Sequence, residues 1–153
     1  MKNKQIKIFT DGSCIKNPGP GGYASIIQHK NYTQIFKAGY KITTNNRMEL
    51  MAAIIPLEKI KNKYNIQIYT DSKYIQLGIT KWIKNWKQQN WKNSKKIEIK
   101  NIDLWKRLDK ITKNYIIQWN WIKSHNGQKN NEYCDKLAKM SAKNPIYIDI
   151  GYK

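Results

Sequence analysis

The chain has 153 residues, of which 29 are Lys or Arg and 10 are Asp or Glu, so its formal net charge is +19. This length suits one domain, and so positive a charge favours a polyanionic partner, nucleic acid before an anionic membrane surface. We find no signal peptide or membrane span, which predicts a cytoplasmic protein. Cys14 and Cys134 are far apart and outside any Cys-x-x-Cys pair, which disfavours a disulfide or zinc framework.

The first half of the chain predicts three strands and a helix. Apolar and polar side chains alternate, as in strands, at residues 5–10, 23–29 and 32–42. A turn-rich stretch, KNPGPGG, separates the first two strands, so the opening predicts an antiparallel meander. Residues 45–60 follow a helical pattern, and we expect Pro56 to kink this helix or end it early.

The second half alternates strands with helices. Residues 65–70 predict a fourth strand, followed by a short helix to about Leu77. Residues 101–113 predict a helix, residues 115–122 a fifth strand and residues 131–143 a last helix. The apolar face of the helix at 101–113 consists of Ile102, Trp105, Leu108 and Ile111.

This order of elements predicts an α/β fold. We expect a five-stranded mixed sheet whose first three strands are antiparallel, with helices on both of its faces. We find no internal repeat or linker, so residues 1–153 are expected to form a single domain.

Four of the few carboxylates stand at the ends of predicted elements. Asp11 ends the first strand, Asp71 ends the fourth, Glu49 lies one turn into the first helix and Asp135 opens the last. Strand ends and helix starts are where α/β sheets place ligand sites. Converging carboxylates need a compensating charge, which Mg²⁺ supplies, and two ions about 3.5–4 Å apart could clamp both oxygens of a phosphoryl displacement.

Each of the four residues also has a purely structural interpretation. Asp11 could lie in a hairpin turn, and Asp71 could cap the helix that follows it. Glu49 could be a favourable charge in a first helical turn, and Asp135 could pair with Lys139 at i,i+4. Taken singly the residues leave both interpretations open, and only their joint pattern favours a site.

Four segments resemble the motifs of bacterial type 1 ribonucleases H, in that family's order and spacing. They are FTDGSCIKNPGPGGYA (9–24), TTNNRMELMAA (43–53), YTDSKYIQLGITKWI (69–83) and WIKSHNGQKNNEYCDKLA (121–138). The resemblance implies the ribonuclease H-like fold and an endonuclease that hydrolyses the RNA strand of RNA–DNA hybrids by a two-metal-ion mechanism. The expected products carry 3′-hydroxyl and 5′-phosphate ends.

The resemblance further implies the cofactor, the partners and the catalytic residues. The ion would be Mg²⁺, with Mn²⁺ as a substitute, and the protein a monomer that binds RNA–DNA hybrid without an obligate protein partner or a membrane. The metal ligands and catalytic carboxylates would be Asp11, Glu49, Asp71 and Asp135. His125 would be an auxiliary residue that handles protons, although a plain polar loop residue is the alternative. Ser72 would support the carboxylates from outside the metal shell.

A substrate-binding set is implied at the turn after the first strand and at the start of the first helix. Cys14, Asn17 and Asn45 would read the RNA 2′-hydroxyl, the group that separates RNA from DNA. Thr44, Asn45 and Arg47 match the family's pocket for a DNA-strand phosphate, and a planar guanidinium suits that task. The alternative for Thr44 and Asn45 is that they cap the helix.

Residues 81–101 carry seven Lys, three Trp and one Glu. They resemble the family's basic protrusion, and Trp82, Asn101 and Trp105 would line the groove for the DNA strand. A solvated basic face is the alternative for the lysines, and packing is the alternative for Trp82 and our expectation for Trp86.

The chain departs from the family where Lys73 and Leu77 replace glutamines that many relatives carry near the scissile strand. Two other functions stay open: another nuclease or strand-transfer enzyme of the same fold, and a non-catalytic hybrid-binding module. The TTNNRMEL segment argues against the first. The complete set of four carboxylates with His125 argues against the second.

Overall fold

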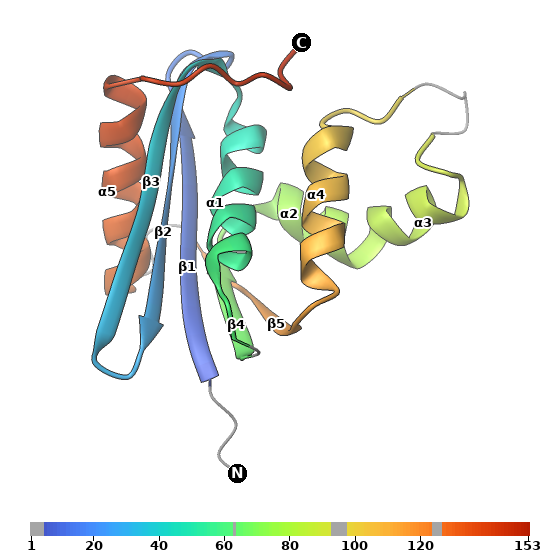
Figure 1. Cartoon of the computed structure of the whole chain (residues 1–153). Coiled ribbons are helices and arrows are strands. Elements are labelled where there is room, and N and C mark those ends of the chain that lie inside the picture. Colours follow the sequence, from blue (N-terminus) through green and yellow to red (C-terminus); the bar gives the residue numbers. More distant parts are fainter. Residues whose placement is uncertain (1–4, 63, 93–97, 124–126) are drawn as a thin grey trace.

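The computed structural model describes residues 5–62, 64–92, 98–123 and 127–153. Its sheet has the strand order β3-β2-β1-β4-β5 (Figure 1). The strands are β1 (Gln5–Cys14), β2 (Gly19–His29), β3 (Tyr32–Thr43), β4 (Asn65–Thr70) and β5 (Ile116–Trp121). β1 pairs with β2 and β2 with β3 in antiparallel fashion, whereas β1–β4 and β4–β5 are parallel. The predicted mixed sheet is therefore confirmed.

Helices cover both faces of the sheet. α1 (Asn45–Lys59) packs on one face and is backed by α4 (Ile102–Thr112), and α5 (Lys129–Lys143) covers the other face (Figure 1). Successive side chains of β1 alternate accordingly, because Ile8 joins the core cluster on the α1 side and Phe9 the cluster beneath α5. None of the described helices is long and apolar enough to cross a membrane.

Several element boundaries differ from those predicted. β1 runs on to Cys14, and Asp11 pairs with Ala24 of β2, so the hairpin-turn interpretation of Asp11 is wrong. β2 begins at Gly19, inside the stretch predicted as a turn, because ladder hydrogen bonds need only backbone groups. α1 continues past Pro56 to Lys59, so the expected early end does not occur.

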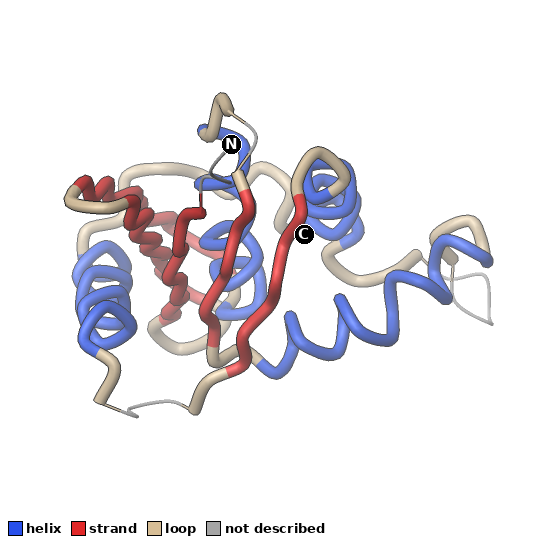
Figure 2. Tube along the Cα trace, turned by 90° about the horizontal axis from the view of Figure 1, so that it is seen from below, coloured by secondary structure: helices blue, strands red, loops and turns tan. Residues whose placement is uncertain are grey.

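The helical backbone also continues beyond Leu77, where the sequence predicted an end. α2 (Lys73–Leu77), a π-helical segment η1 (Gly78–Trp82) and α3 (Ile83–Gln88) follow one another and lead away from the sheet (Figure 2). Aromatic packing explains the extension. The Trp86 ring lies 5.7 Å from that of Trp82 and 5.5 Å from that of Trp105, which confirms the expected packing role of Trp86.

Gly78→Ala tests this packing. A Cβ at this position would overlap the Trp105 ring, so the variant must displace a fully buried side chain. We expect its free energy of unfolding to fall by about 1–3 kcal/mol, measured by urea denaturation, despite the better helix propensity of Ala. Thr80→Ala, at an exposed position of the same segment, is the control. An unchanged Gly78→Ala protein would contradict the close approach.

Candidate active site

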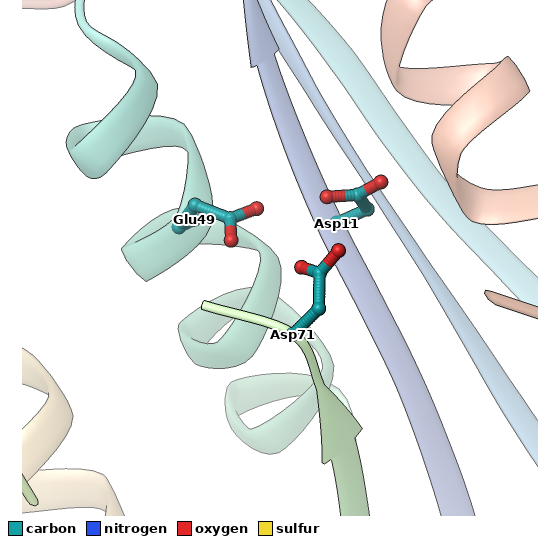
Figure 3. Close-up of side chains that lie close together, drawn as sticks. All are labelled: Asp11, Glu49 and Asp71. Atoms are coloured by element: carbon teal, nitrogen blue, oxygen red, sulfur yellow. The ribbon is translucent and has the colours of Figure 1, made fainter. Parts of the chain in front are cut away.

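Three of the predicted carboxylates meet at one edge of the sheet. Asp11 comes from β1, Asp71 directly follows β4, and Glu49 comes from α1 (Figure 3). One carboxylate oxygen of each lies within 4.8 Å of one of each of the others. β1 and β4 are parallel neighbours, so their carboxyl ends lie side by side, as at the ligand sites of α/β sheets.

Gly12 lets α1 approach β1 closely enough to bring Glu49 to this edge. A Cβ on Gly12 would lie 2.6 Å from the backbone nitrogen of Glu49 and 2.7 Å from the carbonyl carbon of Met48. Those separations are shorter than side chains tolerate, so a larger residue would push the helix away. The Asp-Gly pair of the first motif therefore combines a clustered carboxylate with the space that α1 needs to bring Glu49 beside it.

The three clustered carboxylates line a pocket with a volume of about 450 Å³. Asp135, the fourth predicted carboxylate, lines this pocket too. It lies on α5, and its Oδ2 is 3.0 Å from Nζ of Lys139. This ion pair is the one considered as the structural interpretation of Asp135, so pairing and pocket lining coexist. His125 lies outside the described residues.

Burial and mutual repulsion alter the acidity of the cluster. Burial raises the pKa of Asp11 to about 7, a shift to which the charges of Asp71 and Asp135 add. The pKa of Glu49 is raised well above its usual range, first by complete burial and then by the charge of Asp11. Without a cation, Asp11 and Glu49 therefore give up their protons less readily than ordinary carboxyl groups do.

The donor set suits a hard divalent cation. All the clustered groups offer carboxylate oxygens, the ligands that Mg²⁺ and Mn²⁺ prefer. Oε1 of Glu49 is buried and has no hydrogen-bond partner among the described residues, a costly state unless another group fills the place. A cation would supply that partner and offset the repulsion, so the cluster could hold a metal ion.

Metal binding should accordingly depend on pH, because protons compete for Asp11 and Glu49. A single competing group with a pKa of about 7 predicts that the affinity for Mg²⁺ rises about tenfold from about pH 6 to about pH 8. Calorimetric titration of hybrid-free protein at both pH values measures this. An affinity that does not change would contradict the raised pKa values.

Known proteins resemble this chain in sequence over nearly its whole length. The family model for RNase H matches residues 3–143. The chain belongs to the ribonuclease H family. It is 55% identical over 150 residues to ribonuclease H of Baumannia cicadellinicola subsp. Homalodisca coagulata, covering 98% of both chains, and 53% identical over 150 residues to that of Enterobacter sp. (strain 638), covering 98% of this chain and 97% of that one.

Solved structures agree with this assignment. The crystal structure of LC9-RNase H1, a type 1 RNase H with the type 2 active-site motif, matches 95% of this chain and 75% of its own, with a TM-score of 0.85 and 26% identity. A foamy viral protease-reverse transcriptase structure, at 22% identity and a TM-score of 0.75, covers 92% of this chain and 96% of its own and shares the fold. The fold is thus that of the ribonuclease H family, which is a family of hydrolytic nucleases.

The residues that the ribonuclease H resemblance assigned to the RNA strand lie at one corner of the fold. Oδ1 of Asn17 accepts a hydrogen bond of 3.0 Å from the backbone N–H of Asn45, and Sγ of Cys14 lies 3.4 Å from the carbonyl oxygen of Thr43. The turn after β1 and the start of α1 therefore meet as expected. Thr44 accepts from a backbone N–H of the first turn of α1, so its capping role is observed.

The contacts of Arg47 differ from those predicted. It is 2% exposed, and Asp103 and Asp149 each engage its guanidinium through two hydrogen bonds of 2.7–2.9 Å. Nη1 also donates to Oδ1 of Asn101 at 3.3 Å. All five N–H groups thus point at protein oxygens. This geometry leaves no N–H group of the guanidinium for the expected DNA-strand phosphate, and Arg47 joins α1, α4 and the C-terminal segment.

Trp105 also differs from its predicted role. It is fully buried, and its Nε1 donates to the hydroxyl of Tyr74 at 2.9 Å, so it belongs to the core and not to a DNA-binding groove. Trp82 is half-buried with its ring 5.5 Å from that of Tyr74, so its packing role is observed. Asn101 and Thr44 line a second pocket of about 310 Å³.

The main pocket contains residues that the sequence did not point out as a group. Lys123 and Asn131 were not predicted, and Lys139 was considered only as a pairing partner. A signal existed for two of them: Asn131 and Lys139 flank Asp135 by one helical turn each and so share its face. Ser72 lines this pocket too, but its side chain accepts from the backbone N–H of Ile75 and caps α2, which differs from the expected support of the carboxylates.

Proposed function

We propose that this protein is a metal-dependent endonuclease that hydrolyses the RNA strand of RNA–DNA hybrids, leaving 3′-hydroxyl and 5′-phosphate ends. The convergence of Asp11, Glu49 and Asp71 in a chain of net charge +19 carries the proposal. The positive surface would attract the nucleic acid backbone, and the acidic pocket would act where the chain is cut. Membership of the ribonuclease H family supports the choice of substrate.

The ions would be held by Asp11, Glu49, Asp71 and Asp135, with Mg²⁺ as the proposed ion and Mn²⁺ as its substitute. Two bound divalent cations would stabilise the charge that develops on the attacking and leaving oxygens of the scissile phosphate. The protein's own part is to hold the four carboxylates in place through β1, β4, α1 and α5. His125, which lies outside the described residues, is proposed to carry a proton to or from the reacting groups.

Substrate recognition is proposed to use the corner formed by β1 and α1. Cys14, Asn17 and Asn45 would contact the RNA 2′-hydroxyl, supported by the hydrogen bond that joins Asn17 to Asn45. Thr44 and Asn101, which share the second pocket, would contact a DNA-strand phosphate. Trp82 is proposed to lie beside the DNA strand as well. We further propose that the protein is monomeric and cytoplasmic and has no obligate partner.

One labelled duplex tests the proposal in three forms: RNA–DNA, RNA–RNA and DNA–DNA, each with Mg²⁺ and with a chelator. We expect cleavage of the RNA strand of the hybrid alone, and only with metal. Binding of the hybrid without cleavage, with Mn²⁺ also tried, would instead favour a non-catalytic binding module. Cleavage of DNA–DNA would favour another nuclease of the same fold.

A further inference from the structure

Lys139 reaches into the acidic pocket and contacts one carboxylate there. Its Nζ lies 3.0 Å from Oδ2 of Asp135, and both residues line the pocket that contains Asp11, Glu49 and Asp71. Those last three approach one another within 4.8 Å, and Asp135 lies outside that mutual group. Three carboxylates thus face one another, while the fourth is held by a lysine of its own helix.

We propose that Lys139 acts as an internal counter-ion that competes with a divalent cation for Asp135 and so lowers the affinity of the pocket for that ion. The inference rests on the metal site of the proposed function and adds a residue that tunes it. An ammonium group and a metal ion are both attracted to the oxygens of the Asp135 carboxylate, so the ion pair with Lys139 must weaken before a cation can use that carboxylate fully. Lys139 is a positioning residue, because it acts through Asp135.

The exposure of the pair indicates how strong the competition is. The side chains of Lys139 and Asp135 are 56% and 30% exposed, so their contact is weak and the lysine can turn into solvent. The lysine therefore weakens metal binding without blocking it. Because exposed ion pairs are weak, we expect its removal to tighten binding only about threefold.

The same contact could instead serve only the helix, as i,i+4 pairs of acid and lysine do. That alternative predicts a small loss of stability and no specific effect on metal binding. Lys136 provides a matched control: it is an exposed lysine of the same helix, next to Asp135 in sequence, and it is not among the residues that line the pocket. Replacing either lysine changes the net charge by the same amount.

The experiment is calorimetric titration of Mg²⁺ into the hybrid-free full chain at low salt. We expect Lys139→Gln to lower the Kd about threefold, Lys136→Gln to change it much less, and Lys139→Arg to stay near the wild type. In an Asp135→Asn background, Lys139→Gln should have no further effect, because the interaction runs through that carboxylate.

Equal changes in Lys139→Gln and Lys136→Gln would reduce the effect to net charge and overturn the inference. A weaker affinity in Lys139→Gln would overturn it too, because the lysine would then help to hold the site together. Circular dichroism of each variant confirms that it is folded. Wild-type protein that binds no ion would contradict the proposed function itself, whereas binding that ignores Lys139 would contradict only the present inference.

Discussion

Asp11→Asn is expected to abolish cleavage of the RNA strand while making the metal-free protein more stable at neutral pH. Cleavage should fall because the amide offers a metal ion a neutral and weaker ligand at the position where β1 meets α1 and β4. We expect a loss greater than about 100-fold, the upper end of what changes outside the metal shell produce. Binding of the hybrid should be nearly intact, because the basic surface is unchanged.

The gain in stability follows from the direction of the pKa shift. The pKa of Asp11 rises from 3.8 in its unperturbed state to about 7 in the fold. The folded protein therefore binds this proton more tightly than the unfolded chain does, so the contribution to stability is complete below about pH 4 and is lost as the pH rises through about 7. At about pH 8 the wild type carries a buried, repelled carboxylate, and its replacement should raise the free energy of unfolding by about 2 kcal/mol.

Urea denaturation in chelator, at about pH 5 and about pH 8, measures this effect, which should be larger at the higher pH. Saturating Mg²⁺ should reverse the order, because only the wild type then gains full binding energy. Asp109→Asn is the control: Asp109 forms ion pairs with Lys87 and Lys113, away from the pocket, so its loss should lower stability slightly and leave cleavage unchanged. An Asp11→Asn protein that cuts at the wild-type rate would refute the carboxylate assignment.

The sequence predicted the sheet well because its signals are local. Alternation along β1 to β3 reflects one strand at a time, and the helix N-cap at Thr44 depends on the next three residues. The meeting of Asp11 with Glu49 and Asp71 was reached differently. Periodicity places each carboxylate at an element end or within one turn of it. Only the ordered motifs of a known family indicated that these positions converge.

The errors arise where a partner is distant in the chain or where a local signal was set aside. Asp103 and Asp149 accept hydrogen bonds from the guanidinium of Arg47 but lie 56 and 102 residues away from it in the chain. No rule of sequence spacing links either of them to Arg47. Trp105 falls on the apolar face of its predicted helix, and that pattern correctly indicates burial. The family resemblance suggested a groove instead, so the periodic signal was the better guide at this position.

Arg47→Met should therefore weaken the fold and not the grip on the nucleic acid. Removing the guanidinium leaves Asp149, whose side chain is only 10% exposed, without its charge partner, while Asp103 at 45% exposure can turn to water. Breaking such a buried pair typically costs 3–5 kcal/mol, and because one partner is exposed we expect a loss of about 3 kcal/mol in the free energy of unfolding. Calorimetric melting should show a Tm lower by about 10 °C.

Arg107→Met is the matched control, because Arg107 also makes a two-pronged ion pair, with Glu58, but at a surface where the side chains are 40% and 29% exposed. Its loss should cost less than about 1 kcal/mol. The loss of stability in Arg47→Met should also depend on pH. The guanidinium of Arg47 lowers the pKa of Asp103, so the stability that this pair supplies is lost as the pH falls through that lowered value, and the difference in stability between wild type and Arg47→Met should narrow there.

Hybrid binding then separates the structural role of Arg47 from the phosphate contact that the sequence predicted. A lysine or arginine that touches a phosphate contributes about one unit to the salt dependence of binding, so its removal makes that dependence shallower. Because the Arg47 donors are engaged by Asp103, Asp149 and Asn101, folded Arg47→Met protein should keep the wild-type salt dependence. A shallower dependence at unchanged stability would mean that the carboxylates release the guanidinium when the DNA strand arrives, and the phosphate role would then be restored.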